Sequence, residues 1–331
     1  LIIGYLIKFT GIENPIVIRL FNFIGFILLY LVTIFILKLF HRIKSDGSYE
    51  NTYNLLKSLI VVTICYFLYI SMSFNLNISI NRDVWIYAAY LGSLLFSIIL
   101  IFNNKGSKLL YFILLVFCLW FLGSLRGYAL VSFIVSVMVF FIYRRFLKTR
   151  KAALMTVGLS FLVFGVYYTF LMDYKVFYLN KSLRDALVYR HSALVEDRGS
   201  QMWIRLDEGN YLTFLVNYIH SYLGNLIGPL PWHINSLNTL VIFLLETIPF
   251  ILILLFIYFN RSRLSVPLRY TLFHAFVWFG FISITNDNLG TATRLRTVGW
   301  LPILIVFAVL FADYARNRRN TNKSTASVKW M

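Results

Sequence analysis

The sequence is poor in charged residues, and poorest in acidic ones. Of its 331 residues, 60% are hydrophobic and 13% are charged, and only 13 Asp and Glu accompany 31 Lys and Arg. A soluble domain could not cover so much apolar surface with so few charges. The shortage of charge therefore excludes a soluble protein. Because no hydrophilic stretch is long enough to fold alone, we expect a single transmembrane bundle over residues 1–331.

Cysteine is also scarce, and several catalytic motifs are missing. Cys65 and Cys118 both lie inside apolar runs, which argues against a disulfide framework and against a cysteine-based metal site. The chain contains no P-loop, no His-Glu-x-x-His zinc motif, no dinucleotide-binding fingerprint and no Asp-x-Asp metal clamp. We therefore expect neither a metal ion nor a cofactor, so that any chemistry would depend on arginine side chains.

The chain is rich in apolar runs of about 17–25 residues, which is roughly the length that crosses a bilayer as a helix. These runs predict an all-α polytopic integral membrane protein with about 9–10 transmembrane helices and one large external loop late in the chain. A fragment at Leu1–Phe9 precedes nine complete predicted spans, which are Ile16–Phe40, Ser58–Phe74, Val84–Phe102, Leu109–Gly123, Tyr128–Tyr143, Ala152–Leu171, Leu237–Phe259, Tyr270–Thr285 and Val298–Tyr314.

The basic residues lie mainly in loops between the predicted spans. The formal net charge of +18 invites a nucleic-acid partner, but bases in such loops ordinarily fix membrane topology, so we reject that partner. Nineteen Lys and Arg lie on one side of successive spans and twelve on the other, half of the twelve in the long polar segment at residues 171–236. The positive-inside rule then predicts a cytoplasmic C-terminus and places residues 171–236 in an extracytoplasmic loop.

Arginine dominates the predicted outer side. Nine of its twelve basic residues are Arg, whereas the inner side has ten Arg and nine Lys. Topology requires only positive charge, but the planar guanidinium grips carboxylate or phosphate oxygens better than an ammonium group does. The excess is either a small-number fluctuation, combined with salt bridges to outer acids, or the sign of an outward site for an anionic group.

Two short outer loops carry arginines in confined positions. Arg126 lies in a tight turn between two spans, closely flanked by glycines. It either anchors the helix ends at the headgroups or points into a cavity and binds phosphate. The second loop is Asn286–Thr297. Arg294 and Arg296 would share one side of it if it is extended. Asp287, in the same loop, is a candidate salt-bridge partner for one of these two arginines.

The long polar segment contains a predicted helix over Tyr211–Gly228, lying in the interface plane or forming a partial span. The two prolines of Gly228-Pro229-Leu230-Pro231 stop this helix and force an extended turn. Trp232 suits the headgroup level. His233 is therefore held rigidly near the top of the next span. It is either an interfacial polar residue or a group that orients a substrate hydroxyl or acts as a base.

Several features together form a known pattern. They are the many spans, the large external loop late in the chain, the turn Ser124-Leu125-Arg126-Gly127, the stretch Gly228–Trp232 and a Gly-Thr-x-x-Arg pattern within Asn288–Arg296. In these features the chain resembles the Wzy-type O-antigen and capsular polysaccharide repeat-unit polymerases of the O-antigen polymerase and ligase superfamily. The resemblance covers most of the chain as architecture and three short stretches as motifs.

The resemblance implies a metal-independent glycosyl transfer on the outer face of the bacterial inner membrane, for O-antigen, capsule or exopolysaccharide. The donor would be a glycan on undecaprenyl diphosphate and the acceptor a repeat unit on a second membrane lipid, with a flippase and a chain-length regulator as further partners. The diphosphate would be bound by Arg126, Arg294 and Arg296. His233 or Asp287 would assist the attacking hydroxyl. The glycan would be bound by Arg184, Arg190, Arg198, Arg205 and Trp232.

The rival hypothesis is a polysaccharide flippase or another polytopic transporter. Glu246, one turn before Pro249, and His274 are ionisable residues inside predicted spans, and they would be its coupling residues. The alternatives are a neutral, hydrogen-bonded Glu246 and a satisfied core His274. The sequence has no internal repeat of the kind many transporters show, and its polar residues concentrate on one face rather than at the midplane. A third hypothesis is a non-catalytic membrane partner of an assembly complex.

Overall fold

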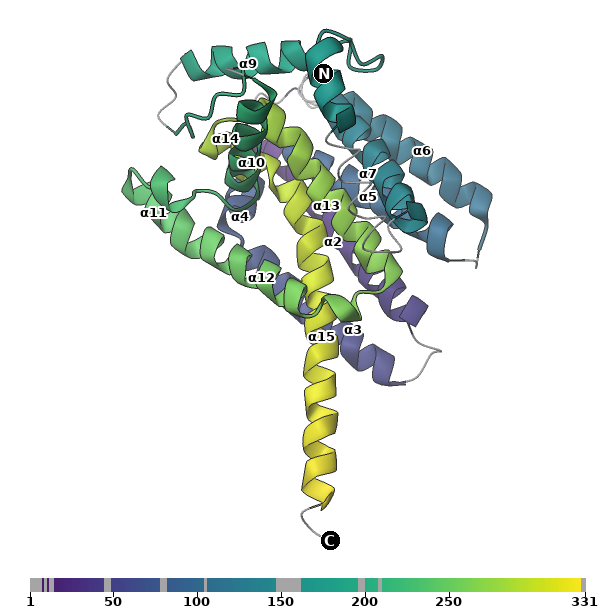
Figure 1. The fold of residues 1–331 in the computed structure, drawn as a ribbon. Helices are drawn as coiled ribbons and strands as arrows, with labels where there is room; N and C mark the ends of the chain where they lie inside the picture. The colour runs from purple at the N-terminus through teal and green to yellow at the C-terminus, as the bar shows by residue number, and fades with distance from the viewer. Residues whose placement is uncertain are drawn as a thin grey trace. The chain divides into compact units, whose positions relative to one another are not determined.

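A computed structural model shows that the protein is built of α-helices (Figure 1). It describes residues 15–44, 49–77, 82–103, 106–146, 162–195, 200–207 and 210–328, together with Lys8 and Gly11. Within this part of the chain the only extended pairings are two isolated bridges, Val176 with Lys181 and Gln201 with Asn288. The prediction of an all-α protein is confirmed.

Most predicted spans match a helix to within a few residues, whereas α3 begins well before Ser58 and α15 continues well beyond Tyr314. The helices are α2 (Pro15–Lys44), α3 (Tyr49–Leu68), α4 (Ile70–Asn77), α5 (Asp83–Phe102), α6 (Lys108–Leu125), α7 (Gly127–Phe146), α9 (Leu183–Val195), α10 (Tyr211–Ile227), α11 (Leu237–Ile242), α12 (Ile248–Phe259), α13 (Val266–Thr285), α14 (Leu289–Leu295) and α15 (Thr297–Val328). The short turns η1 (Pro231–His233) and η3 (Arg261–Arg263) are 3₁₀-helical, and η2 (Phe243–Thr247) is a π-helical turn between α11 and α12.

Six helices of the described chain are long and apolar enough to cross a membrane, so the protein is polytopic. They are Ile16–Ile43, Asp83–Phe102, Lys108–Leu125, Gly127–Arg145, Leu237–Phe259 and Thr297–Arg316. Of the other three predicted spans, Ser58–Phe74 is divided at Tyr69 into α3 and α4. Ala152–Leu171 begins outside the described residues, which resume as helix at Leu162. Tyr270–Thr285 is helical within α13 but is less apolar than the six.

The chain groups into two compact units, which are described one at a time. Unit 1 comprises Leu1–Phe121, Ile251–Leu272 and Trp300–Met331, and unit 2 comprises Leu122–Phe250 and Phe273–Gly299.

In unit 1, α2 packs along α5 and α3. The ring of Phe21 in α2 stacks on Trp85 in α5, with ring centroids 4.4 Å apart. A buried hydrogen bond of 3.1 Å joins Thr33 in α2 to the hydroxyl of Tyr66 in α3. A polar pair that is buried in a helix bundle is satisfied within the protein, so this contact fixes how α2 and α3 pack against each other.

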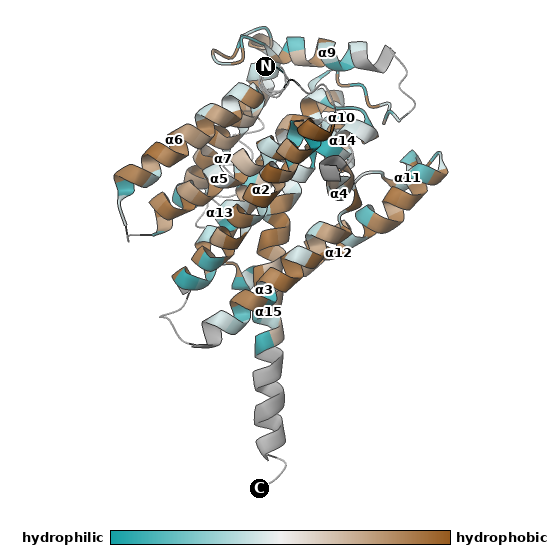
Figure 2. Ribbon diagram, turned by 180° about the vertical axis from the view of Figure 1, so that it is seen from behind, coloured by the Kyte–Doolittle hydropathy of each residue, from teal (hydrophilic) through white to brown (hydrophobic). Residues whose placement is uncertain are grey.

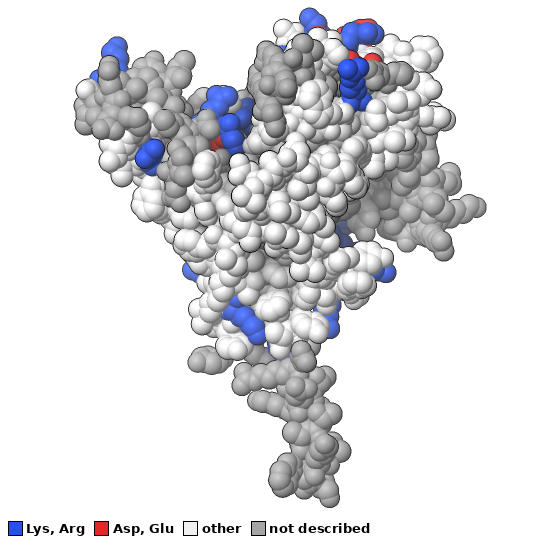
Figure 3. Space-filling model, turned by 90° about the vertical axis from the view of Figure 1, so that its left-hand side faces the viewer, with Lys and Arg blue, Asp and Glu red and all other residues white. Residues whose placement is uncertain are grey.

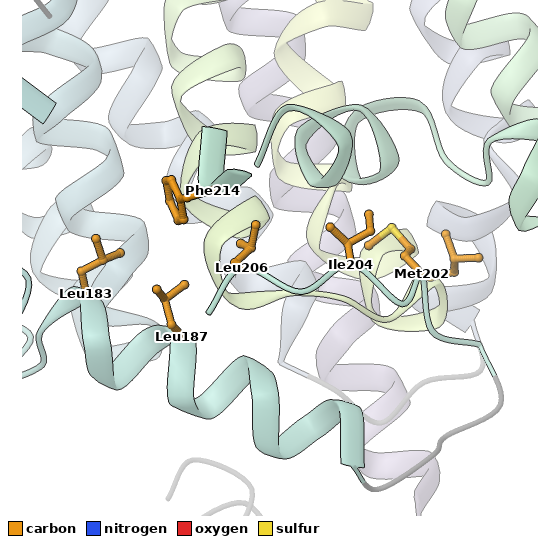
Figure 4. Packing of buried hydrophobic residues seen from close by; sticks show 7 residues of the cluster. Leu183, Leu187, Met202, Ile204, Leu206 and Phe214 are labelled. Atoms are coloured by element: carbon orange, nitrogen blue, oxygen red, sulfur yellow. The ribbon is translucent and has the colours of Figure 1, made fainter. Parts of the chain in front are cut away.

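In unit 2, α9 lies crosswise to α10 (Figure 1). A buried hydrophobic cluster joins α9, the extended segment at residues 200–206, α10 and α14. Its members are Leu183, Leu187, Met202, Ile204, Leu206, Phe214 and Leu289 (Figure 4). Residues 202, 204 and 206 point inward because side chains alternate along an extended chain. Trp203 and Arg205 are correspondingly exposed.

The exposed surface of many helices is apolar. Hydrophobic residues run along α2, α6 and α12, whereas hydrophilic residues gather near helix ends and around α10 and α14 (Figure 2). A space-filling view shows a broad surface without charged side chains (Figure 3). Exposed apolar residues on α6 include Leu109, Phe117 and Trp120. Such a surface is suited to contact with lipid.

Helix α10 matches the predicted helix at Tyr211–Gly228, and its two faces differ. Its buried face includes Ser221, Gly224 and Asn225, while an exposed stripe consists of Leu212, Val216, Ile219 and Leu223. The 17 residues of α10 rise about 25 Å at 1.5 Å each, which falls short of the roughly 30 Å hydrocarbon core. An apolar outer stripe on a helix of this length fits both alternatives from the sequence, a helix in the interface plane and a partial span.

We predict that Gly299→Ala destabilises unit 2. A β-carbon at Gly299 would lie 2.6 Å and 2.7 Å from carbons of the Phe279 ring and 3.1 Å from Trp278. Forcing these rings apart should lower the free energy of unfolding by about 1–3 kcal/mol. The measurement is thermal unfolding of the detergent-solubilised full chain. Gly92→Ala is the control, because its β-carbon would meet only the Cys118 thiol at 3.3 Å. Equal melting temperatures for the two variants would contradict the prediction.

Candidate functional site

Unit 2 contains a buried ion pair between Arg190 of α9 and Asp287, which follows α13. The Arg190 side chain is 1% exposed and the Asp287 side chain 3% exposed. Besides the guanidinium, the Asp287 carboxylate accepts hydrogen bonds from the backbone N–H of Trp203 at 3.0 Å and of Ile204 at 3.1 Å. Its own carbonyl accepts the N–H of Met202 at 2.8 Å. Asp287 thus fixes the extended segment at residues 200–206 mainly through that segment's backbone.

The remaining donors of Arg190 bind three other parts of unit 2. Its Nε donates to the carbonyl of Ile204 at 3.1 Å. Its Nη1 donates to the carbonyls of Ser283 and Asn286 at 2.9 Å and 2.7 Å, and to the Ser221 hydroxyl at 3.0 Å. These acceptors come from the 200–206 segment, from α13 and the residues after it, and from α10. One guanidinium therefore cross-links four segments.

Burial disfavours the charged form of both Arg190 and Asp287, whereas the opposite charge of the partner favours it. Burial raises the pKa of Asp287, against the Arg190 charge and the two backbone N–H donors. Burial lowers the pKa of Arg190 to about 10, against the Asp287 charge. A carboxylate with a guanidinium and two amide donors stays ionised near neutral pH, so we treat the pair as charged and net neutral.

A second buried ion pair holds the turn at Gly228–His233. Arg296, which links α14 to α15, pairs with Glu246 in the π-helical turn η2 and donates to the carbonyl of Gly228. The Thr247 hydroxyl donates to the next carbonyl, that of Pro229, at 3.3 Å. The Gly228–Pro229 peptide bond is cis. The turn that sequence analysis attributed to its prolines is therefore also held by side chains from two other elements.

His233 ends this turn and is buried, with 7% exposure. Its Nδ1 accepts the backbone N–H of Leu230 at 3.3 Å. The His220 ring from α10 stacks on it, with centroids 5.4 Å apart and planes 18° apart. The neighbouring Trp232 is 66% exposed and donates its indole N–H to His220 Nε2 at 2.8 Å. The three rings form one contiguous aromatic group at the end of α10.

Contacts connect Arg126 with the end of α14. Arg126 lies between α6 and α7 and donates to the Tyr128 hydroxyl at 2.9 Å. The Tyr128 ring contacts Trp278, with centroids 5.6 Å apart. The Trp278 indole N–H donates to the carbonyl of Leu295 at 2.8 Å. Leu295 lies directly between Arg294, which is half-buried, and the buried Arg296. Two aromatic side chains thus link the first arginine-bearing loop to the second.

The other predicted glycan-binding arginines have different surroundings. Arg184 is exposed and pairs with Asp173. Arg205 is exposed, and its carbonyl accepts the Asn217 amide at 2.7 Å. Arg198 lies outside the described residues. Arg190 is committed to the Asp287 network. Within unit 2, Arg296, Trp232 and His233 therefore belong to the Gly228–His233 turn or contact it, and Arg126 is linked through Tyr128 and Trp278 to Leu295, next to Arg294. Asp287 holds the extended segment at residues 200–206.

Several residues of this region had not been singled out by sequence. The apolar pattern predicts Tyr128 and Trp278 only as parts of spans, and Asn225 only as part of a helix. In the buried network the side-chain amide N–H of Asn286 donates to Asn225 Oδ1 at 2.7 Å. An amide inside an apolar helical stretch was the available signal for Asn225, but nothing in the sequence identified its partner.

In the described chain no group of three or more His, Cys, Asp or Glu side chains is arranged to hold a metal ion. Comparison with known proteins found no matching family model, no matching curated protein and no matching solved structure.

We predict that Arg190→Met destabilises the protein by about 3–5 kcal/mol, because it leaves the Asp287 charge buried without its partner. The readout is unfolding of the detergent-solubilised protein. Arg184→Met is the matched control, since it removes an arginine from an ion pair on the exposed surface, and pairs of that kind contribute little to stability. Similar losses in the two variants would show that the buried pair is not the stabilising element proposed.

We also predict that acid weakens the fold through His233. Burial lowers the pKa of His233 from 6.5 to about 4. Between these two pH values His233 is protonated in the unfolded state and neutral in the folded state. The contribution is fully present above the unfolded pKa of 6.5, and it is lost as the pH falls from there toward the folded pKa of about 4, by about 1.4 kcal/mol per pH unit. Melting temperatures measured across this window should fall less for His233→Gln than for the unaltered protein. Parallel curves would rule out His233 as the source.

Proposed function

We propose that this membrane protein polymerises lipid-linked oligosaccharide repeat units, transferring a growing glycan from undecaprenyl diphosphate to a repeat unit on a second lipid. The product would be O-antigen, capsule or exopolysaccharide. The resemblance to Wzy-type polymerases supports the proposal, and so does the polytopic architecture. We place the reaction on the outer face of the bacterial inner membrane, because the basic clusters of the short loops favour a cytoplasmic position for the opposite side.

The observation that carries the proposal is the series of contacts from Arg126 through Tyr128 and Trp278 to Leu295. It connects one sequence-predicted phosphate-binding arginine with the loop that bears the other two. Departure of a lipid diphosphate develops negative charge, which fixed guanidinium groups stabilise in a site that excludes water. Arg126, between α6 and α7, and Arg294, in α14, would supply these guanidinium groups.

The three arginines have different roles in this proposal. Arg126 and Arg294 are half-buried, so their guanidinium groups can reach a ligand at the surface of unit 2. Arg296 donates through Nη1 and Nη2 to Gly228 and Glu246, and only its Nε lacks a partner among the described residues. We therefore assign diphosphate binding to Arg126 and Arg294, and positioning of the Gly228–His233 turn to Arg296.

The bond changes follow from the donor and the acceptor. An acceptor hydroxyl oxygen attacks the anomeric carbon, the bond from that carbon to the diphosphate oxygen breaks, and the diphosphate leaves with the electron pair. The hydroxyl proton passes to the oxygen of the departing diphosphate, so the step balances without a protein base. Asp287 is not assigned the role of a base, because the Arg190 guanidinium and two backbone amides occupy its carboxylate. In the proposal it positions the extended segment at residues 200–206.

Transport is the competing hypothesis, and Glu246 was its candidate coupling residue. Glu246 lies within a candidate span, in a π-helical turn, and pairs with Arg296. Glu246→Gln would leave the buried Arg296 charge uncompensated, so that variant would impair either kind of protein. The two functions are better separated by asking where lipid-linked glycan accumulates.

The decisive experiment uses a strain that lacks the gene and a gel that resolves surface polysaccharide by single repeat units. Loss of the ladder while single repeat units are still exported supports the polymerase. Lipid-linked units trapped on the cytoplasmic side would instead support a flippase. An unchanged ladder would refute both the polymerase and the flippase, and the arginines would then bind another ligand.

Complementing that strain with variants tests the arginines. Arg126→Lys and Arg294→Lys keep the charge but lose the planar fork, so we expect chain growth to fall by about 10-fold or more while protein abundance is unchanged. Arg261→Lys is the control, because Arg261 is an exposed residue of η3 in unit 1. A normal long-chain ladder from either test variant would refute the assignment of that residue.

A further inference from the structure

The His233 ring has a defined hydrogen-bonding pattern at one nitrogen only. Its Nδ1 accepts the backbone N–H of Leu230 at 3.3 Å. A neutral imidazole carries one proton, so a ring that accepts at Nδ1 is protonated at Nε2. The Nε2 atom is buried and has no hydrogen-bond partner in the described part of the chain. His233 therefore presents an unsatisfied N–H donor.

An unsatisfied buried donor is unusual and costly. Most buried polar side-chain atoms in proteins have a partner, and leaving one without a partner forfeits the hydrogen bond that it made with water. Here the surrounding structure enforces the arrangement. Arg296 and Thr247 bind the carbonyls of Gly228 and Pro229, so the turn cannot easily rotate to give the ring another acceptor. A rigid, unsatisfied donor of this kind is what a site for a ligand oxygen requires.

The surroundings of the donor suit a sugar. Trp232, next in the chain, is held at its edge by the hydrogen bond to His220 and exposes most of its surface. A tryptophan fixed in this way offers a flat apolar face, against which the C–H groups of a pyranose ring can stack. The nearby charges do not favour an anion, because Arg190 and Asp287, which both act on His220, neutralise each other.

We propose that the Gly228–His233 turn is a sugar subsite in which neutral His233 donates its Nε2–H to a hydroxyl or N-acyl oxygen of the glycan, beside the face of Trp232. His233 is then a substrate-binding residue and does not act as the base. His220 is a positioning residue that fixes the Trp232 edge. The identity of the ligand as a glycan rests on the proposed function, whereas the protonation state of the ring does not.

Variants of His233 introduced into the deletion strain distinguish a hydrogen-bond donor from a catalytic base. In His233→Gln the side-chain amide N–H can occupy a place near Nε2–H, whereas in His233→Asn the amide reaches only as far as Nδ1. We expect His233→Gln to retain most of the chain growth, and His233→Asn and His233→Ala to lose it by about 10-fold, the effect of one lost hydrogen bond to substrate. Loss in all three variants at normal abundance would indicate a base and overturn the proposal. Full activity in all three would also overturn it, because the donor would then take no part in binding the glycan.

Trp232 provides a second pair of variants. Trp232→Phe keeps an aromatic face but loses the hydrogen bond to His220, and Trp232→Leu loses both. Stacking on a sugar predicts about 10-fold weaker chain growth for Trp232→Leu and a smaller effect for Trp232→Phe. Equal activity of the two variants would refute stacking.

The protonation state can be measured without any assumption about function. Full-length protein labelled with ¹⁵N-histidine in detergent should show one neutral ring protonated at Nε2, and this ring should not titrate between about pH 5 and pH 8. The signal is assigned by its absence from His233→Gln. A ring protonated at Nδ1, or a charged ring, would overturn the proposal even if the polymerase is established. The two experiments can also give different answers. If the His233 ring is neutral and protonated at Nε2 but the deletion strain shows an unchanged ladder, His233 is still an unsatisfied donor and its ligand is not a glycan.

Discussion

The arrangement of unit 2 depends on one buried guanidinium. Arg190 donates to acceptors in the 200–206 segment, α10 and the end of α13, and Asp287 compensates its charge. Neither charge could stay buried without the other, because the cost of removing an ion from water is recovered only through close partners. The pair therefore makes four segments mutually dependent, and it fixes the frame on which the aromatic and arginine side chains of the candidate site are carried.

Burial separates the arginines of unit 2 into two groups. Arg190 and Arg296 are almost fully enclosed and are compensated by Asp287 and Glu246. Arg126 and Arg294 are half-buried. Within unit 2, the buried carboxylates of Asp287 and Glu246 each hold an arginine in place. Arginines therefore serve both to hold the site together and, in our proposal, to bind a ligand. Their burial distinguishes the two groups.

The helices of this protein are predictable from its sequence, whereas the contacts between distant residues are not. Apolar runs of membrane length are a local property, so most span ends were found within a few residues. The division at Tyr69 between α3 and α4 was missed, since no Gly or Pro marks it. Arg190 and Asp287 are 97 residues apart in the chain. Only the nearer Arg294 and Arg296 were considered as partners for Asp287, because no pattern in one sequence connects residues so distant. The candidate turn at Gly228–His233 was recognisable from its prolines, but the unsatisfied nitrogen of its histidine was not.

The way Asp287 holds the extended segment has a consequence for how this protein can change. It binds the segment through backbone N–H groups, and the inward side chains at 202, 204 and 206 supply the packing. The backbone of Trp203 supplies one of these N–H groups, whereas the side chains of Trp203 and Arg205 are exposed and lie outside the inward cluster. Trp203 even adopts a left-handed backbone (φ 58°) that Asn or Gly would accept more readily. Mutation at these two positions can therefore alter what the segment offers to a ligand without altering its path, so the site can acquire new specificity while its framework stays fixed.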